Sequence, residues 1–441
     1  MSSNFCATTR ARRALTGFRL RAGVTVGCSV MFTLMSAAVR ADVRFADVVH
    51  IEGDRLATFD GMPIERLGVF ACDGQHCAPI PFQVDERDSV GHWVVDQGPE
   101  PNQDNPPGVL DGNDSLLFMA TDAGQRTTAD RLPAGQPRAE ITVFDPISGA
   151  ARWVYLLAFP GPAPRSATSY VDYDPSTDQV RGARVVLGFR QGVPGYLGVI
   201  DGPGAGVPNL LDRMKVRASA TFLWGLIHFS RNEDDLTTQF VGWRQGPIRV
   251  IRRQRQWVRL GWGIHSVTFG SYTFFYREFA ELPVGLNLNF PPTYFFGNIT
   301  IKAVLDFRDL RGWSVLAPGL AAPLPIDGIM TPEKVALNQV RGSWFALLSG
   351  QVTLVEMMNL SPSLATVRRR LLYREDAVSD PPESHRGEEP GIGYQLDAWE
   401  HTGAGAHQLE SISYALPPDI TVRDFMAARE APLRVQVQPL P

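Results

Sequence analysis

The sequence predicts an all-β protein, an antiparallel β-sandwich followed by a larger β-sandwich or supersandwich. Gly and Pro together make up 75 of the 441 residues, and such frequent turn residues divide a chain into short segments. Short runs of apolar and β-branched residues recur throughout, whereas apolar residues at a sustained helical spacing do not. Short strands separated by turns are typical of sandwiches.

The apolar runs give the expected strands in chain order. In the first part of the chain these are 44–51, 91–95, 115–120, 139–145 and 152–159, and in the rest they are 183–189, 217–224, 248–260, 271–279, 298–307, 343–350, 352–358 and 407–416. The one expected helix is 421–430, where Asp424 lies early and Arg429 late, as the helix dipole favours.

The N-terminus predicts export. Residues 1–21 contain arginines and no acidic residue, a mostly apolar run follows at 22–38, and "VRA" ends at Ala41. This order predicts a signal peptide, residues 1–41, and a periplasmic or extracellular protein with no transmembrane span after cleavage. A membrane anchor is the alternative, but the run is shorter than the roughly 20 apolar residues that a span needs.

The length predicts two domains. About 400 residues exceed one ordinary core. A Pro-, Ser- and Asp-rich stretch suggests a linker at 161–182, between an N-terminal sandwich at 42–160 and a C-terminal sandwich or supersandwich at 183–441. A second polar stretch, 373–393, is expected to be a long exposed loop.

The net charge argues against nucleic acid as a partner. Residues 1–41 hold six arginines and no acid, so cleavage leaves 36 basic and 46 acidic residues and a net charge of about −10. A protein this acidic is a poor general binder of nucleic acid.

The two cysteines that remain after cleavage suit a disulfide. Cys72 and Cys77 flank the turn residues Asp73 and Gly74, and an exported protein meets oxidising conditions. A metal site with His76 is the alternative, but it lacks a fourth ligand.

Asp111, Asn113 and Asp114 lie on a Gly-containing turn before an apolar strand. Asp and Asn favour tight turns because their side chains bond the nearby backbone. The sequence therefore predicts a structural turn and no metal or cofactor, with Ca²⁺ as the alternative because the oxygen ligands are dense.

Two pairs of stretches each carry a resemblance to known proteins. "IPFQVDERD" followed by "VLDGNDSLLFMATDAG" resembles a pattern in exported bacterial β-sandwich proteins of unassigned function, which implies fold and compartment but no catalytic residues. More weakly, "LLDRMKVRASATF" followed by "QGPIRVIRRQRQWV" resembles the supersandwich domains of galactose-mutarotase-like proteins and some polysaccharide lyases.

The stretch "QGPIRVIRRQRQWV" overlaps the most basic segment of the chain, 248–260. If it is a strand, Arg253, Arg255, Trp257 and Arg259 fall on one face, and aromatic residues including Tyr276 follow closely. Arginine recognises carboxylates and sugars stack on aromatic rings, so this face predicts a site for an acidic polysaccharide or another anionic ligand. The alternative is a solvated face whose arginines pair with acids of neighbouring strands, such as Glu278, Asp306 or Asp309.

Catalytic residues cannot be assigned from the sequence. A lyase could use a base among His228, His265 and Tyr276 with Arg253 or Arg255 to neutralise a carboxylate, and a glycoside hydrolase could use Glu400 and Glu410, or Asp397 and His401. The motifs of serine hydrolases, zincins and P-loop NTPases are absent from the sequence.

The prediction is therefore an exported binding or structural protein, and whether it is an enzyme stays open. The first alternative is a carbohydrate-active enzyme, lyase-like or mutarotase-like. The second is an accessory subunit of a cell-envelope assembly, with the apolar stretch 282–297 facing a protein partner.

Overall fold

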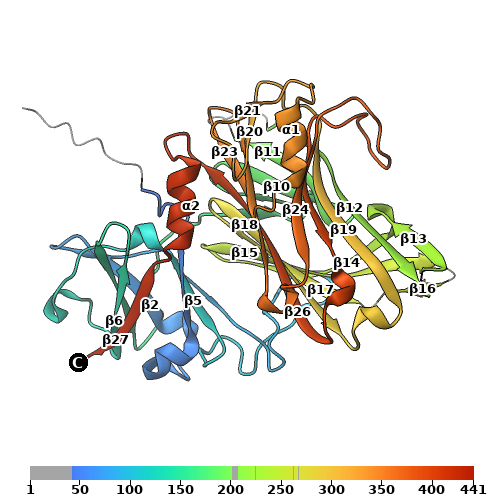
Figure 1. The fold of residues 1–441 in the computed structure, drawn as a ribbon. Helices are drawn as coiled ribbons and strands as arrows, with labels where there is room; N and C mark the ends of the chain where they lie inside the picture. The colour runs from blue at the N-terminus through green and yellow to red at the C-terminus, as the bar shows by residue number, and fades with distance from the viewer. Residues whose placement is uncertain (1–41, 201–206, 224, 262, 267) are drawn as a thin grey trace, which may run out of the picture. The chain divides into compact units, whose positions relative to one another are not determined.

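The computed structural model describes residues 42–200, 207–223, 225–261, 263–266 and 268–441. The described part consists mainly of antiparallel strands in five sheets (Figure 1), which confirms the predicted all-β class. It contains two α-helices, α1 (Pro332–Ala336) and α2 (Val422–Glu430), and α2 confirms the expected helix. The predicted signal peptide lies outside the described residues. Within them, no helix has the length and apolar character needed to cross a membrane.

Two sheets, formed by strands within residues 48–158 and by one strand near the C-terminus, pack as a sandwich around one core. Its residues come from both sheets and include Ile51, Phe118 and Ile141. The first sheet has the order β1 (Val48–Glu52), β5 (Ser115–Met119), β4 (Gln83–Asp85), and the second has the order β27 (Arg434–Leu440), β6 (Arg138–Phe144), β7 (Ala151–Ala158), β2 (Leu67–Cys72), β3 (Cys77–Pro79). Cys72 and Cys77 form the expected disulfide across the turn between β2 and β3.

Strand β5 links this sandwich to the rest of the chain. Its five residues are all buried. Leu116 and Phe118 pack into the sandwich core, whereas Leu117 and Met119 pack into a second core with residues of the large sheet and of α2. The unbroken apolar run at 115–119 therefore reflects a strand that is covered on both faces.

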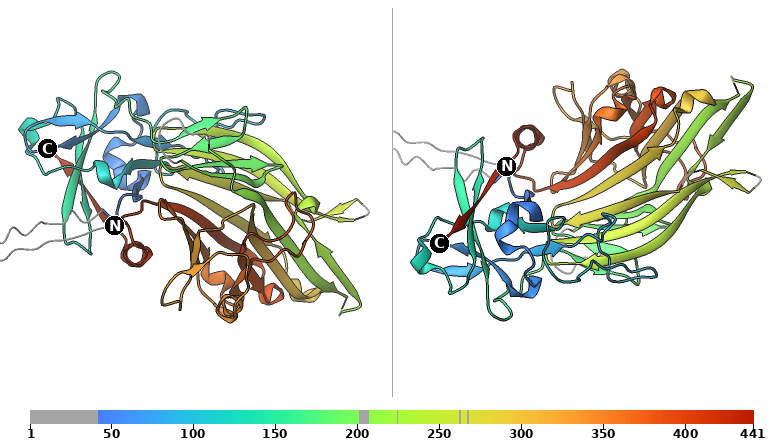
Figure 2. Two further views of the ribbon diagram at one scale, coloured as in Figure 1. Left: turned by 90° about the horizontal axis from the view of Figure 1, so that it is seen from above. Right: turned by 90° about the horizontal axis from the view of Figure 1, so that it is seen from below.

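The later part of the chain forms two large sheets that enclose the largest core, which includes Phe307, Phe345 and Tyr394. Figure 2 shows their long strands from two sides. The five-stranded sheet has the order β13 (Ile227–Arg231), β12 (Leu211–Phe222), β19 (Phe296–Phe307), β25 (Gly391–Asp397), β24 (Arg368–Arg374). The ten-stranded sheet has the order β14 (Leu236–Gln245), β15 (Arg249–Gly261), β17 (Phe269–Tyr276), β18 (Phe279–Leu288), β26 (Gly405–Leu416), β23 (Thr353–Leu360), β22 (Trp344–Leu348), β20 (Ser314–Leu316), β21 (Leu324–Pro325), with β16 (Ile264–His265) paired to β15.

The predicted division into two domains stays a prediction. Residues Ala41–Pro441 form one compact unit, and β27 near the C-terminus completes the N-terminal sheet by pairing with β6 (Figure 1). The segment expected to be a linker contributes two strands to a four-stranded sheet. Its order is β11 (Val193–Val199), β10 (Val185–Arg190), β9 (Gln179–Arg181), β8 (Asp172–Asp174).

The prediction of a strand at 91–95 is wrong. This segment makes a single β-bridge, between Arg87 and Trp93, and is otherwise irregular. Its backbone is held by a side chain, because the Val95 N–H donates to Asn102 Oδ1 at 2.9 Å. The Trp93 ring packs edge-on against Phe274 of the large sheet. The apolar residues are therefore buried in an anchored loop instead of a strand ladder.

Candidate ligand-binding face

Strand β15 lies between the edge strand β14 and β17, and its register places its side chains. Arg253 is opposite Tyr272 of β17, and Arg255 is opposite both Gln239 of β14 and Gly270 of β17. Because side chains alternate along a strand, Arg253, Arg255, Trp257 and Arg259 share one face, as the alternation predicts. The two halves of the strand nevertheless have different surroundings.

The first half of β15 is buried and paired. Arg249 is 2% exposed, and its Nε donates to the Asp85 carboxylate at 2.7 Å while another guanidinium nitrogen donates to Tyr276 Oη at 2.8 Å. The guanidinium also lies 4.3 Å from the Phe274 ring centroid. Burial alone would lower the pKa of Arg249, and its partners Tyr276 and Asp85 raise it above the ordinary value. This arginine is part of the fold.

Arg252 is anchored on the opposite face of the strand. It is also 2% exposed, and it donates to both carboxylate oxygens of Asp178, at 2.9 and 2.7 Å. Its guanidinium lies 3.9 Å from the Phe189 ring centroid. Since Asp178 precedes β9 and Phe189 belongs to β10, Arg252 ties the ten-stranded sheet to the four-stranded sheet.

The acidic motif at residues 80–88, which carries the first resemblance, contacts β15 and its neighbour β14. Gln83 Oε1 accepts hydrogen bonds from the backbone N–H groups of Ile248 and Arg249, at 3.1 and 3.0 Å. Glu86 pairs with Arg244 of β14 at 3.1 Å. Together with Asp85, this motif holds the N-terminal sandwich against the arginine strand.

The acids expected to pair with β15 have other partners. Glu278 pairs with Arg184 at 2.9 Å, Asp306 with Lys215 at 2.9 Å, and Asp309 with Arg311 at 3.8 Å. Arg249, Arg252 and Arg255 do pair with acids, but the acids are Asp85, Asp178 and Glu100. Arg249 and Arg252 are buried, so only the pair of Arg255 lies on a solvated face. Sequence reasoning missed these acids because all of them precede β15 by more than 70 residues.

The second half of β15 is more open. Arg255 pairs with Glu100 at 2.7 Å, and both side chains are more than a third exposed. Arg253 lies 5.6 Å from the Tyr272 ring centroid, and no ion pair joins it to any described carboxylate. Trp257 is half-buried beside the His265 ring, and exposed Arg259 donates to the Asp234 carbonyl. This half presents guanidinium groups and an indole to solvent.

Tyr276 does not belong to this open half. It lies opposite Arg249 at the other end of the same face, and it is 2% exposed. Its hydroxyl bonds Arg249 and Glu281, and burial raises its pKa above the ordinary value. A ligand on the open half would contact Arg253, Arg255, Trp257 and Arg259 instead.

A pocket of about 540 Å³ lies next to the open half of β15. It is found where β17 and β18 part, beyond the last register pair, Ser271 with Val284. Gly270, the partner of Arg255, lines the pocket together with Gly285, and a Cβ on either glycine would meet no atom of a described residue within 4 Å. The remaining lining residues are Thr268, Phe269, Leu286, Asn287, Ser361, Ser363, Ala406, His407 and Gln408.

His407 is the buried polar group of this pocket. Its Nδ1 lies 3.1 Å from Ser363 Oγ and its Nε2 lies 2.9 Å from the Gly403 carbonyl oxygen. Sequence reasoning missed the pocket because its residues come from four separate segments. The glycines gave the one signal in the sequence, since a Gly inside a strand often marks a close approach or a space left for a ligand.

The residues nominated for catalysis are dispersed. His228, His265 and Tyr276 lie on three different strands, β13, β16 and β17. Glu400 accepts from the Ile299 N–H at 2.9 Å, and Glu410 accepts from the Asn359 amide at 3.1 Å. Asp397 accepts from the Thr300 hydroxyl at 2.9 Å, and His401 lies 3.6 Å from Glu400. These contacts give Glu400, Glu410, Asp397 and His401 structural partners.

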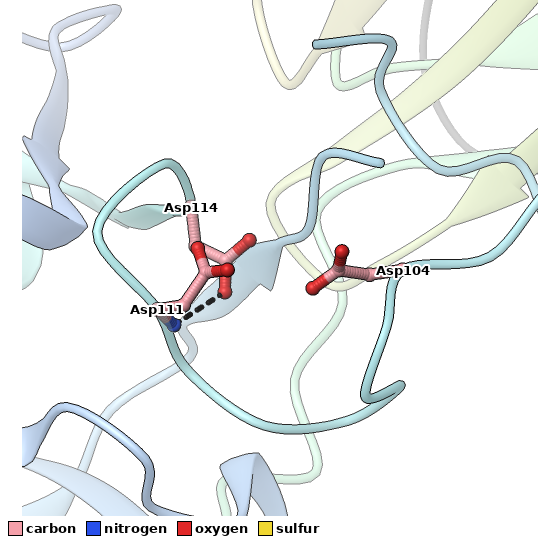
Figure 3. Close-up of side chains that lie close together, drawn as sticks. All are labelled: Asp104, Asp111 and Asp114. Carbon is pink, nitrogen blue, oxygen red and sulfur yellow. Dashed lines mark hydrogen bonds between the residues drawn. The ribbon is translucent and has the colours of Figure 1, made fainter. Parts of the chain in front are cut away.

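The predicted acidic turn is present. Asp111 Oδ1 accepts from the Asn113 N–H at 2.9 Å, and Asp114 Oδ2 accepts from the Asp111 N–H at 3.0 Å (Figure 3). Asp104, which the sequence did not single out, lies beside this turn. Nothing in the sequence signals this approach, because six residues of irregular chain separate Asp104 from Asp111.

Comparisons with known proteins give a likeness of fold. No family model and no curated protein matches the sequence. An alpha-mannosidase from Enterococcus faecalis V583 is similar to the chain with a TM-score of 0.47 and 8% identity, over 89% of this chain and 44% of that one. A protein in glycosyl hydrolase family 38 from Enterococcus faecalis gives a TM-score of 0.42 and 8% identity, over 89% and 45%. The chain spans less than half the length of either structure, and likeness at this level carries no argument about activity.

Proposed function

We propose that the protein binds an anionic carbohydrate. In this proposal the pocket beside Gly270 and Gly285 takes a sugar ring, and the open half of β15 contacts the acidic group. The observation that carries it is the adjacency of the two features, since a pocket-lining glycine is the register partner of Arg255. A volume of about 540 Å³ falls in the range of small-molecule sites, roughly 300–1,000 Å³.

The lining of the pocket suits a polyhydroxylated ligand. Asn287 and Gln408 offer amide donors and acceptors, and Ser361 adds a hydroxyl that can both donate and accept. Phe269 and Leu286 supply apolar surface for the C–H groups of a sugar ring. A mixture of a few polar groups with apolar walls is what fixes a small ligand in one orientation.

The open arginines suit a carboxylate or sulfate on that ligand. A guanidinium group binds such anions with two parallel hydrogen bonds, and Arg253 has no acid that already occupies it among the described residues. Arg255 would exchange Glu100 for the ligand at little cost, because a surface ion pair contributes about 0–1 kcal/mol. Trp257 offers an indole face on which a second sugar ring can stack.

The predicted signal peptide supports an extracytoplasmic site of action, where acidic polysaccharides are accessible. The dispersed histidines and carboxylates favour binding over catalysis. We therefore propose a binding protein, with a carbohydrate-active enzyme kept as the alternative.

The test measures binding of the purified protein to a panel of oligosaccharides. The panel pairs uronic-acid and sulfated oligomers with neutral glucose and galactose oligomers of equal length. Gly270→Leu should abolish binding, because the added side chain enters the open space of the pocket, and Arg253→Gln should weaken binding to the acidic oligomers roughly tenfold or more. Gly161→Leu, whose Cβ also meets open space, is the matched control and should bind normally. Equal binding by all four proteins, or no binding by the parent, would refute the proposal.

A second candidate function is docking to a partner through an apolar surface. Within the predicted partner stretch 282–297, Phe290, Tyr294 and Phe295 are exposed, and Leu226 and Ile227 at the β12–β13 turn are exposed as well. The two groups are neighbours, because the Leu223 N–H donates to the Phe295 carbonyl. Large exposed apolar groups of this kind often mark interaction sites.

This second function is tested by self-association and envelope fractionation. Tyr294→Ser with Phe295→Ser should release the protein from an envelope fraction that retains the parent. Val90→Ser, a change at an exposed apolar residue elsewhere, is the control and should leave the distribution unchanged. Identical distributions for all three proteins would reject docking.

A further inference from the structure

Three carboxylates of the N-terminal sandwich converge on one point. Asp104, Asp111 and Asp114 each offer one oxygen atom, and these atoms all lie within 4.8 Å of one another. Figure 3 shows Asp111 and Asp114 on the turn before β5, with the Asp104 carboxylate pointing toward them from a separate loop.

The turn is fixed by its surroundings. The Gly53 N–H donates to the Asp114 carbonyl at 2.7 Å, and the Asp54 N–H donates to the Gly112 carbonyl at 3.0 Å. A Cβ on Gly53 would lie 1.8 Å from the Asp111 carbonyl oxygen, so this close approach requires glycine. Asp114 itself is fully buried, and its Oδ1 accepts from the Arg87 N–H at 3.1 Å.

One carboxylate oxygen of Asp104, Oδ2, takes no part in the hydrogen bonds that hold the turn. The residue is 4% exposed, and its Oδ2 has no hydrogen-bond partner among the described residues. An unpaired buried carboxylate is costly, so this oxygen calls for a positive partner.

A second cluster in the chain shows what such a partner looks like. Asp306, Glu383 and Glu388 also bring three carboxylate oxygens within 4.8 Å of one another. There Lys215 Nζ lies 2.9, 3.3 and 2.6 Å from the three groups. In contrast, no described Lys or Arg side chain forms an ion pair with Asp104, Asp111 or Asp114.

We propose that Asp104, Asp111 and Asp114 bind a divalent cation, with Ca²⁺ as the fitting ion. Oxygens that bind Ca²⁺ lie roughly 2.3–2.6 Å from it, so opposite ligands are separated by about 4.6–5.2 Å. The three oxygens fall within that span and could share one ion, with water completing its coordination. The sequence of the turn left Ca²⁺ binding open as an alternative. We adopt it here because Asp104 supplies the third carboxylate. It is independent of the proposed carbohydrate site.

The test measures Ca²⁺ binding by the full protein after treatment with a chelator. Equilibrium dialysis with Ca²⁺ should give one ion per chain, with a dissociation constant of roughly 0.1–1 mM, as in other extracellular modules. Melting should occur several degrees higher in excess Ca²⁺ than in chelator, because an ion that binds the folded state alone stabilises it. Mg²⁺ should give a smaller shift, since it demands a tighter octahedral shell.

Matched variants separate the site from general charge effects. Asp104→Asn should weaken Ca²⁺ binding at least tenfold, and so should Asp111→Asn, which keeps the oxygen that accepts from Asn113. Asp96→Asn, at an exposed carboxylate of the same region, should bind Ca²⁺ as the parent does. No bound ion in the parent at millimolar Ca²⁺ would overturn the proposal, and so would equal binding by the parent and both cluster variants. Either result would mean that protons neutralise the cluster.

Discussion

The two halves of β15 use the same residue type in two ways. Arg249 and Arg252 are almost completely buried, and each meets a carboxylate from an earlier part of the chain. Arg253 and Arg259 make no ion pair with a described acid, and Arg255 makes one at the surface. Five arginines within eleven residues of an acidic protein therefore do not form one basic patch.

The difference teaches that partner and burial decide the role of a charged residue. A guanidinium in the interior needs a carboxylate, and Asp85 and Asp178 supply one to each buried arginine. A guanidinium at the surface keeps its water and remains available to a ligand. The buried half attaches the N-terminal sandwich and the four-stranded sheet to the large sheet. In the open half, Arg255 is the register partner of Gly270, which lines the pocket.

The largest expected effect comes from removing a buried arginine. Arg249→Met should lower the free energy of unfolding by about 3–5 kcal/mol, because it leaves the Asp85 carboxylate buried and uncompensated. Urea unfolding followed by tryptophan fluorescence measures this. Arg253→Met, the same change four residues later, should stay within about 1 kcal/mol of the parent. Similar losses for both variants would erase the distinction between the halves.

A smaller effect is expected from Glu281, which accepts from Tyr276 beside the buried half. Burial raises the pKa of Glu281 from 4.5 to about 7, and Glu410 contributes to the rise. Between these values the folded protein keeps a proton that the unfolded chain has lost, so this group makes stability fall as the pH rises. Glu281→Gln should therefore be more stable than the parent by about 1–3 kcal/mol above pH 7 and equal to it below pH 4.5. A difference that is the same at both pH values would contradict the shifted titration.

The smallest effect is expected at the surface pair of Arg255 and Glu100. A double-mutant cycle with Arg255→Gln and Glu100→Gln should give a coupling free energy below about 1 kcal/mol that shrinks further in 0.5 M salt. A coupling of several kcal/mol, insensitive to salt, would show that Arg255 is a structural residue like Arg249.

Local sequence patterns predicted much of the fold. Alternation placed the β15 side chains, the C-x4-C spacing predicted the disulfide, and charge placement located α2. Long-range pairing was beyond the sequence, since nothing at 373–393 signals that Glu375 and Glu388 are buried. Lys334 and Lys215 neutralise them from distant segments, so this stretch is not simply an exposed loop.

The candidate site divides in the same way. The row of Arg253, Arg255, Trp257 and Arg259 follows from a two-residue period, which any strand imposes. The pocket does not follow from this period, because it depends on where β17 and β18 part and on which loop then lies nearby. Closeness in sequence groups Tyr276 with the arginines of the open half, whereas the register places it beside Arg249.

The most direct test of the central claim is backbone hydrogen exchange with and without the acidic oligosaccharide that binds most tightly in the panel. We expect slower exchange at 268–270, 285–287 and 406–408, the strand ends that line the pocket, and unchanged exchange around Arg249 and Arg252. Protection confined to other segments at saturating ligand would contradict the claim that the open half of β15 and its pocket form the binding site.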